Sequence, residues 1–354
     1  MNAPFSPPRD CVSVVDLSDH KEAARIESFV AERDATPFHR PAWLRAVEQG
    51  TGQRAVGLIA ERRGALTGWL PLTEVRSPLF PAALVSSGFA VGGGILADST
   101  ATAQRLSEAA TELAQRRSCT SVELRGGVLP GNWHVVGGKH ANFSAPLAEN
   151  DEAQLLSITR RQRADVRKGL ERPFAVSSGN GAAERASHYA VYAESVRNLG
   201  TPVFPRALFD AVLDEFGDDA DILTLRLDGV PIASVLTLYH RGVAMPYWGG
   251  GTFAARATKA NERLYYELMC HARRQGCHTF DFGRSKVGSG PFAYKKNWGF
   301  TPEPLTYATW HSAGSEVRNV DPTSDAYSAK IALWKRLPLS VSNLLGPSIA
   351  RGLA

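Results

Sequence analysis

The chain has 354 residues, 44% of them hydrophobic and 21% charged, which are ordinary values for globular proteins, and this length favours two domains. A net charge of +5 is mildly basic and favours anionic partners such as phosphates, nucleotides, RNA or acidic sugars. The four cysteines are scattered and form no C-x-x-C pair, and no stretch reaches the ~20 apolar residues that span a bilayer. The scattered cysteines predict reduced thiols and no metal site. The N-terminus lacks a secretion signal, so we expect a cytoplasmic protein.

In the first half, β-branched strands alternate with helices that follow capping residues. A turn signal at Arg63-Gly64 joins two apolar segments, which predicts a β-hairpin. The elements expected in chain order are a strand at 12–17, a helix after Ser18, a helix from Pro41 to Gly50, the hairpin, a glycine-rich stretch, a helix at about 101–117 and a strand at 121–125.

The second half repeats this plan. A hairpin signal at Asp228-Gly229 is followed by a strand ending in glycines, "GVAMPYWGGG", then by a helix at about 259–275 and the strand "TFDFG". When Arg105 is placed on Arg263, "RLSEAATELAQRRSCTSVEL" aligns without a gap with "RLYYELMCHARRQGCHTFDF". In this alignment Glu123 falls on Asp281. A hairpin of the same kind upstream in both halves favours duplication over coincidence.

We therefore expect an α/β (α+β) fold, a tandem duplication of one domain with mixed β-sheets flanked by helices. Residues 10–148 would form the first domain. Residues 149–311 would form the second, which carries the main site and opens with a basic helical segment at 150–172. Residues 312–354 predict a C-terminal tail of two further helices, packed on the first domain.

Several catalytic and cofactor motifs are absent from the sequence. It has no G-x-x-x-x-G-K-[ST] phosphate loop, no G-x-G-x-x-G after a strand, no G-x-S-x-G elbow and no H-E-x-x-H pair. These absences disfavour a nucleotide kinase, a nicotinamide enzyme, a serine hydrolase and a zinc enzyme.

Two basic segments lie in the second half, "RRQRADVRKG" (160–169) and "GRSKVGSGPFAYKK" (283–296). The second follows a strand directly, and ligands of such sheets bind past strand ends, where glycines let backbone N–H groups approach an anion. Arg284, Lys286, Lys295 and Lys296 would supply the charge. For the first segment the alternative is the solvated face of a helix. In the second, aromatic residues among the cations favour a pocket wall over a solvated loop.

The residues "FDFGRS" followed by "YKKNWGF" resemble the C-terminal signature of the FemAB-like branch of the GNAT acyltransferase superfamily. More narrowly, they resemble FemAB-related proteins associated with PEP-CTERM/exosortase exopolysaccharide systems. Other resembling pieces, in order over nearly the whole chain, are "HRPAWLRAVEQ", "GWLPLTEVRSPLF", "VELR", "RADVRKGL", "VRNLGTPVFP" and "ALWKRLPLSVSNLLGP". The resemblance implies two GNAT-like domains and N-acyl transfer, in the best-known members from aminoacyl-tRNA to an amine of a peptidoglycan precursor.

Within this resemblance, the lysine of an F-K-x-x-[FW]-G pattern at the reaction centre falls on Lys295, with Tyr294 in place of the phenylalanine. Arg167 and Arg284 are the candidates for holding a nucleotide-sugar diphosphate. Two departures leave the donor open between aminoacyl-tRNA and acyl-CoA. The Q/R-x-x-G-x-G/A loop that holds coenzyme A has no clear match, and the coiled-coil insertion by which some FemAB enzymes engage tRNA is missing. No tightly bound cofactor is expected.

Acyl transfer to an amine needs a positive group near the carbonyl oxygen and a route for the amine proton. We expect Lys295 to supply the charge and Asp281 to accept the proton or to orient Arg284, with a structural Asp281–Arg284 salt bridge as the alternative. Trp248 would stack on a sugar or base, or else pack in the core. The substrate-binding candidates are Arg284, Lys296, Arg167, Lys168, Arg163, Thr201 in the loop "NLGTPVFP", Trp248 and Tyr294.

The predicted function is transfer of an acyl or aminoacyl group to an amine on a cell-envelope or exopolysaccharide precursor. The alternatives are a non-catalytic GNAT-fold module that binds a nucleotide-sugar or acidic glycan, and an RNA-associated protein with salt-sensitive binding. The expected partners are a small-molecule or nucleotide-sugar-linked acceptor and aminoacyl-tRNA. The tail "ALWKRLPLSVSNLLGPSIARGL" is basic and apolar enough for peripheral association with a membrane glycan-assembly complex. The alternative is a pair of helices packed on the first domain.

Overall fold

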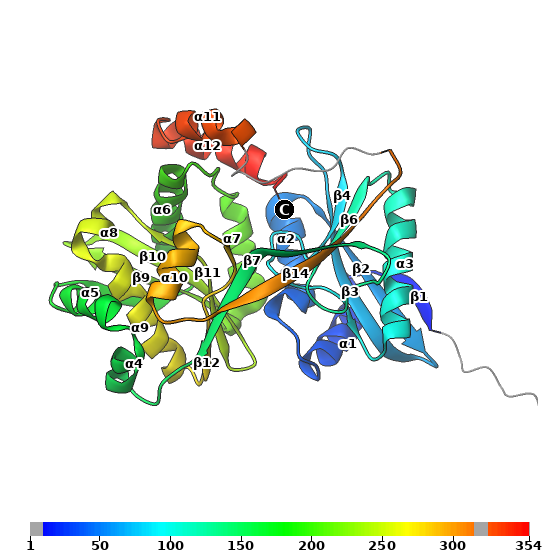
Figure 1. Ribbon diagram of the computed structural model, residues 1–354, viewed down its shortest axis with the longest axis horizontal. Coiled ribbons are helices and arrows are strands. Elements are labelled where there is room, and N and C mark those ends of the chain that lie inside the picture. Colours follow the sequence, from blue (N-terminus) through cyan, green and yellow to red (C-terminus); the bar gives the residue numbers. More distant parts are fainter. Residues whose placement is uncertain (1–9, 315–324, 354) are drawn as a thin grey trace, which may run out of the picture. The chain divides into compact units, whose positions relative to one another are not determined.

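The structure, a computed structural model, describes residues 10–314 and 325–353 (Figure 1). The described chain divides into two units. Unit 1 takes in residues 10–136 and 306–314, and unit 2 takes in residues 137–305 and 325–353. The boundaries fall inside two strands, β7 (His134–Pro146) and β14 (Pro302–His311), so each of these strands contributes residues to both units.

Unit 1 is built on a mixed sheet in the order β1-β2-β3-β4-β6-β14. All its neighbouring strands are antiparallel except β4 and β6, which are parallel from Ala83↔Ser121 to Val85↔Glu123. The bounds are β1 (Cys11–Val15), α1 (His20–Ala31), η1 (Pro37–His39), α2 (Pro41–Thr51), β2 (Arg54–Arg62), β3 (Ala65–Val75), β4 (Ala83–Ser86), β5 (Leu96–Ala97), α3 (Thr100–Arg116) and β6 (Ser121–Arg125).

Unit 2 has a second mixed sheet, in the order β7-β12-β11-β10-β9-β8. Here too a single neighbouring pair among the described strands is parallel, β11 with β12. The bounds are α4 (Asp151–Ser157), α5 (Arg160–Leu170), β8 (Ala175–Gly179), α6 (Ala182–Leu199), α7 (Arg206–Phe216), η2 (Gly217–Asp219), β9 (Ala220–Leu227), β10 (Val230–His240), β11 (Val243–Gly251), α8 (Phe253–Thr258), α9 (Ala260–Arg274), β12 (Thr279–Asp281), β13 (Ser285–Lys286), α10 (Gly290–Asn297), α11 (Asp325–Trp334) and α12 (Leu339–Ala350).

The expected duplication is confirmed. Both predicted hairpins have two consecutive residues with positive φ, 53° and 82° at Arg63-Gly64 and 52° and 79° at Asp228-Gly229, which is the geometry that matches the right-handed twist of paired strands. In each unit the hairpin precedes a strand, a helix and a second strand that is parallel to the first. The α/β fold class with mixed sheets flanked by helices is therefore confirmed.

In both units the helix between the parallel strands buries an apolar face against the sheet. In unit 1, α3 buries Leu106, Ala110 and Ala114 in a cluster with side chains of β2, β3 and β6. In unit 2, α9 buries Leu264, Leu268 and Ala272 among side chains of β9, β10 and β12. The aligned pairs Leu106–Leu264 and Ala114–Ala272 thus occupy equivalent core positions.

Three local expectations need correction. The basic segment 150–172 is not one helix, because Ile158 and Thr159 have extended backbones that separate α4 from α5. The run 283–296 contains helix α10 in addition to loop residues. The C-terminal helices belong to unit 2 rather than to the first domain. Glycines allow this contact, since a Cβ at Gly200 would meet Ile331 and one at Gly346 would meet Val203; the tail residues 315–324 lie outside the described residues.

Candidate active site

The turn after β12 is set by Asp281. Its Oδ1 accepts hydrogen bonds from the Gly283 N–H at 2.9 Å and from Asn142 Nδ2 at 3.0 Å. Gly283 has φ +75°, a conformation that costs glycine little because it has no Cβ. Burial raises the pKa of the Asp281 carboxyl, and the two hydrogen bonds and the Lys295 charge oppose this rise. The result is a buried carboxylate held at the end of a strand.

Lys295 reaches this turn from helix α10. Ser289 caps the helix by accepting from the Phe292 N–H, and Pro291 occupies its first turn, which suits a residue without an N–H donor. The Lys295 side chain is 9% exposed. Its Nζ donates to the Gly283 carbonyl at 2.8 Å and to the Arg284 carbonyl at 3.0 Å. The glycine-rich run and the lysine therefore form one unit of structure.

The surroundings of Lys295 destabilise its charge. Burial lowers the pKa of its ammonium to about 8, the Asp281 carboxylate opposes this shift, and the Arg284 guanidinium adds to it. The Nζ lies 5.6 Å from the ring centroid of Phe143 and 5.5 Å from that of Phe282. A cation between aromatic rings and away from water interacts more strongly with nearby charge than a solvated one does.

Tyr294, the neighbour of Lys295, presents a phenol on another side of α10. Burial raises the pKa of this phenol well above its ordinary value, and the Glu262 carboxylate adds to the rise. The hydroxyl is buried and has no hydrogen-bond partner among the described residues. The Trp298 indole N–H opposes part of this rise in pKa. The Tyr294 phenol therefore stays protonated, and its O–H is available as a hydrogen-bond donor.

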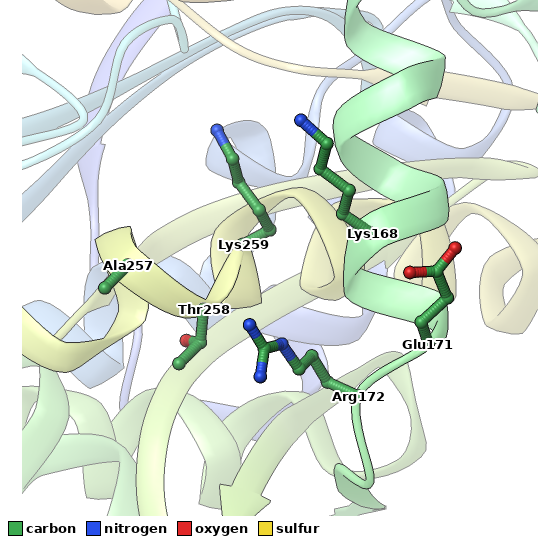
Figure 2. Close-up of a pocket in the computed structure, with 6 residues that line it drawn as sticks. All are labelled: Lys168, Glu171, Arg172, Ala257, Thr258 and Lys259. Atoms are coloured by element: carbon green, nitrogen blue, oxygen red, sulfur yellow. The ribbon is translucent and has the colours of Figure 1, made fainter.

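A cationic cavity of about 460 Å³ lies between α5 and the junction of α8 and α9. Figure 2 shows the Arg172 guanidinium directed towards Thr258, and the Lys168 and Lys259 side chains extending in a similar direction from their two helices. Asp165 holds both lysines, at 3.0 Å from Lys259 Nζ and 3.8 Å from Lys168 Nζ. The lining is Lys168, Glu171, Arg172, Ala257, Thr258 and Lys259. Three cations against the carboxylates of Glu171 and Asp165 leave a net positive charge, which favours an anionic occupant such as phosphate.

The structure brings several of the predicted residues together. Asp281, Arg284 and Lys295 meet at the turn after β12, Tyr294 lies beside them on α10, and Lys168 lines the cavity. The hydrogen bonds of Asp281 go to Asn142 and Gly283 and not to Arg284, which disfavours the salt-bridge alternative.

The other predicted residues neither accept the hydrogen bonds of Lys295 nor line the cavity. Arg163 is half-buried and Arg167 exposed on α5, and neither lines the cavity. Lys296 is exposed, with its Nζ 6.0 Å from the Phe292 ring centroid. Thr201 is exposed in the segment between α6 and α7. Trp248 is enclosed by aromatic rings, at 4.7 Å from Phe209, which favours packing over ligand stacking.

Sequence reasoning missed Asn142 and Phe143, which come from β7 and reach the site through its antiparallel pairing with β12 and β13. It also missed Glu262, Arg172 and Lys259. The acid and the lysine flank the start of α9, which follows the glycine-rich end of β11 after the short helix α8, and that helix start was the available signal for an anion site.

Unit 2 combines a mixed sheet, one parallel strand pair and a helix between the paired strands. Residues 157–296 match the family described as acetyltransferase (GNAT) domain. This segment of unit 2 is therefore similar to a GNAT domain, and the chain has the fold of two GNAT-like domains in tandem. No curated protein sequence matches the chain.

Three solved structures show the same fold over most of the chain. "Crystal structure of FemX" is similar with a TM-score of 0.63 and 15% identity, covering 84% of this chain and 96% of that one. A "tandem GNAT protein from the clavulanic acid biosynthesis pathway (without AcCoA)" has a TM-score of 0.57 and 12% identity, covering 87% and 100%. "The structure of L-PGS from Bacillus licheniformis" has a TM-score of 0.54 and 12% identity, covering 97% and 99%. At these identities the similarity establishes the fold.

Proposed function

We propose that unit 2 is an N-acyltransferase that moves an acyl or aminoacyl group from an activated donor to an amine. The observation that carries the proposal is the buried Lys295, held by two backbone carbonyls beside Asp281 in the domain that matches the GNAT family. Burying an ammonium away from water costs free energy, and such costs are typical of functional sites.

In this mechanism the amine nitrogen attacks the acyl carbonyl carbon, so that a C–N bond forms and the bond to the leaving sulfur or oxygen breaks. Lys295 stabilises the negative charge that develops on the carbonyl oxygen. Asp281, with its raised pKa, accepts the amine proton. Tyr294, protonated and without a hydrogen-bond partner among the described residues, donates a proton to the leaving group.

Two features support an extended, phosphate-bearing donor. β11 pairs with β12 through Val243 and Ala244 only, whereas it pairs with β10 up to Gly251. The rest of its edge can therefore bond the amides of an extended ligand. The cavity lined by Lys168, Arg172 and Lys259 begins beyond the end of this strand and suits a phosphate. Acyl-CoA and aminoacyl-tRNA both carry the required chemistry.

For the acceptor we propose an amine on a cell-envelope or exopolysaccharide precursor, nucleotide-sugar-linked or small. The proposal takes support from FemX and L-PGS as structural neighbours and from the residues that resemble FemAB-related proteins of PEP-CTERM/exosortase systems. We place the reaction in the cytoplasm, where both donors occur, with no tightly bound cofactor.

One observation favours a second candidate, a non-catalytic module that binds a nucleotide-sugar or acidic glycan. Two of the three donors of the Lys295 ammonium are already used by carbonyls of its own loop. A lysine with this arrangement also acts as a structural tie. The two functions differ in whether removal of the charge abolishes transfer or only lowers stability.

The test combines ligand binding with transfer. Acetyl-CoA, longer acyl-CoAs, UDP-sugars and a non-hydrolysable aminoacyl-tRNA mimic are screened by thermal shift, and each hit is followed by a transfer assay. The variant is Lys295→Met, which keeps the volume and removes the ammonium. Lys139→Ala, an exposed lysine of the same unit, is the matched control. Transfer that survives in Lys295→Met, or a wild type that binds ligand without transfer, would reject catalysis by Lys295.

A further inference from the structure

Helix α12 turns its large apolar side chains outwards. Its small residues Ser342, Gly346 and Ala350 are buried, and a Cβ at Gly346 would lie 3.0 Å from the Val203 backbone, so this face packs closely on unit 2. The opposite face carries Leu344, which is 77% exposed, and Leu345, which is 46% exposed. A helix that packs on a globular domain usually buries its large apolar side chains, whereas α12 buries small residues and exposes leucines.

Further exposed apolar side chains lie on α12, α11 and α6. Val341 lies one turn before Leu345 and is 36% exposed, and Leu333 on α11 is 65% exposed. Leu199 at the end of α6 is 57% exposed, next to Gly200, which packs against Ile331 of α11. Figure 1 shows α11 and α12 beside α6. We call Leu333, Val341, Leu344 and Leu345 the tail patch.

The charged residues of the two tail helices are mostly cations. Helix α11 begins with Asp325, and residues 326–353 then include Lys330, Lys335, Arg336 and Arg351 and no aspartate or glutamate. Lys335 and Arg336 are exposed in the turn that links α11 to α12. Exposed leucines flanked by cations are the composition of helices that lie in the plane of an anionic lipid surface. Among the described helices, none has the length and apolarity needed to cross a bilayer.

We propose that the tail patch is a docking surface for an anionic phospholipid membrane, on which unit 2 rests peripherally. The leucines enter the interface between headgroups and acyl chains, and Lys335 and Arg336 bind the headgroup phosphates. This inference is independent of the acyltransferase proposal, because it uses neither Lys295 nor the cationic cavity.

The test is sedimentation of the full chain with vesicles of phosphatidylcholine alone or mixed with equal phosphatidylglycerol. We expect binding to the mixed vesicles only, weakened by 1 M salt because screening shortens the reach of the charges (Debye length ~3 Å). Leu344→Ser with Leu345→Ser should weaken binding roughly tenfold, and Lys335→Gln with Arg336→Gln by a similar factor.

The control is the pair Leu79→Ser and Val230→Ser, which removes two apolar side chains that are 62% and 60% exposed elsewhere. It should bind vesicles as the wild type does. Equal binding by the leucine variant, or no binding of the wild type to the mixed vesicles, would overturn the proposal. Light scattering after size-exclusion chromatography tests whether the tail patch binds a second copy of this chain instead. A wild-type dimer that becomes monomeric in the leucine variant, without vesicle binding, would also overturn the proposal.

Discussion

The two units share one parallel strand pair but continue it differently. In unit 1, β4 and β6 pair through Val85↔Glu123, and a further parallel bridge joins Ile95 to Gly127. In unit 2, β11 and β12 pair through Ala244↔Phe280, and no later residue of the described chain joins β11 to β12. Glu123 and Asp281 occupy the same position in the sequence alignment, but the chain that follows each of them folds differently.

Backbone closes the end of the strand pair in unit 1. A Cβ at Gly94 would lie 1.9 Å from the Gly126 carbonyl oxygen, so only glycine allows this approach. The buried Arg125 donates to the Ala90 carbonyl at 2.6 Å and pairs with Glu123. In unit 2 the same place is held by a lysine from a separate helix. The two copies therefore share the sheet, and the end of the strand pair is closed by backbone in unit 1 and held by a buried lysine in unit 2.

The largest expected effect sharpens this contrast in unit 2. Lys295→Met should lower kcat by about 10²–10³-fold, the usual loss when a preorganised charge-stabilising donor is removed. The thermal midpoint should fall as well, because the Gly283 and Arg284 carbonyls lose their donor. Steady-state kinetics of the folded variant measures the first effect. A loss of stability with unchanged kcat would assign Lys295 to structure alone.

The second prediction concerns unit 1. Gly94→Ala should lower the free energy of unfolding by about 1–3 kcal/mol, because the new methyl group overlaps backbone atoms that must move. Transfer per folded molecule should stay unchanged. Gly131→Ala, whose Cβ would meet no atom within 4 Å, is the control in the same unit. Denaturant unfolding measures the stability of both variants. A Gly94→Ala protein as stable as the wild type would contradict the close backbone packing at the end of the strand pair in unit 1.

The third prediction concerns the cationic cavity. Arg172→Gln or Lys259→Gln should raise KM for the phosphate-bearing substrate roughly tenfold, the cost of losing a charged hydrogen bond, with little change in kcat. Arg274→Gln on the exposed side of α9 is the control. The Arg274 guanidinium comes no closer than 3.8 Å to the Asp151 carboxylate, so its removal breaks no short ion pair with that residue. A fall in kcat with constant KM would instead place the two residues near the reacting atoms.

The fourth prediction follows from the lowered pKa of Lys295. The ammonium loses its proton near pH 8 in the folded chain and near 10.5 in the unfolded chain, so kcat should fall about fivefold between pH 8 and pH 9. Because the unfolded chain binds more protons between pH 8 and 10.5, this group makes stability rise with pH in that window. Lys295→Arg should remove the alkaline fall from whatever activity remains. A wild-type profile flat to pH 10 would contradict the protonated role.

Local signals in the sequence predict the hairpins, α3, α9 and the strands β6 and β12, since turn residues and helical periodicity act over a few neighbours. The position of Asp281 at a strand end points to its carboxylate, whereas the choice of Lys295 among four cations comes from the resemblance to FemAB-like proteins. Helix α10 escaped because its start, "GSGP", reads as a loop although Ser289 and Pro291 form a cap. Asn142 could not be assigned, because its contact with Asp281 spans 139 residues and depends on the register of β7.

The position of β7 decides how this protein can be divided. The GNAT-matched segment covers residues 157–296. Asn142, which donates to Asp281, and Phe143, whose ring lies near the Lys295 ammonium, both come before it. A fragment cut at the match would expose the edge of β12 and leave Asp281 without its amide donor. An excised unit 2 must therefore begin ahead of His140, where pairing with β13 starts, and it must keep the tail helices that cover Gly200.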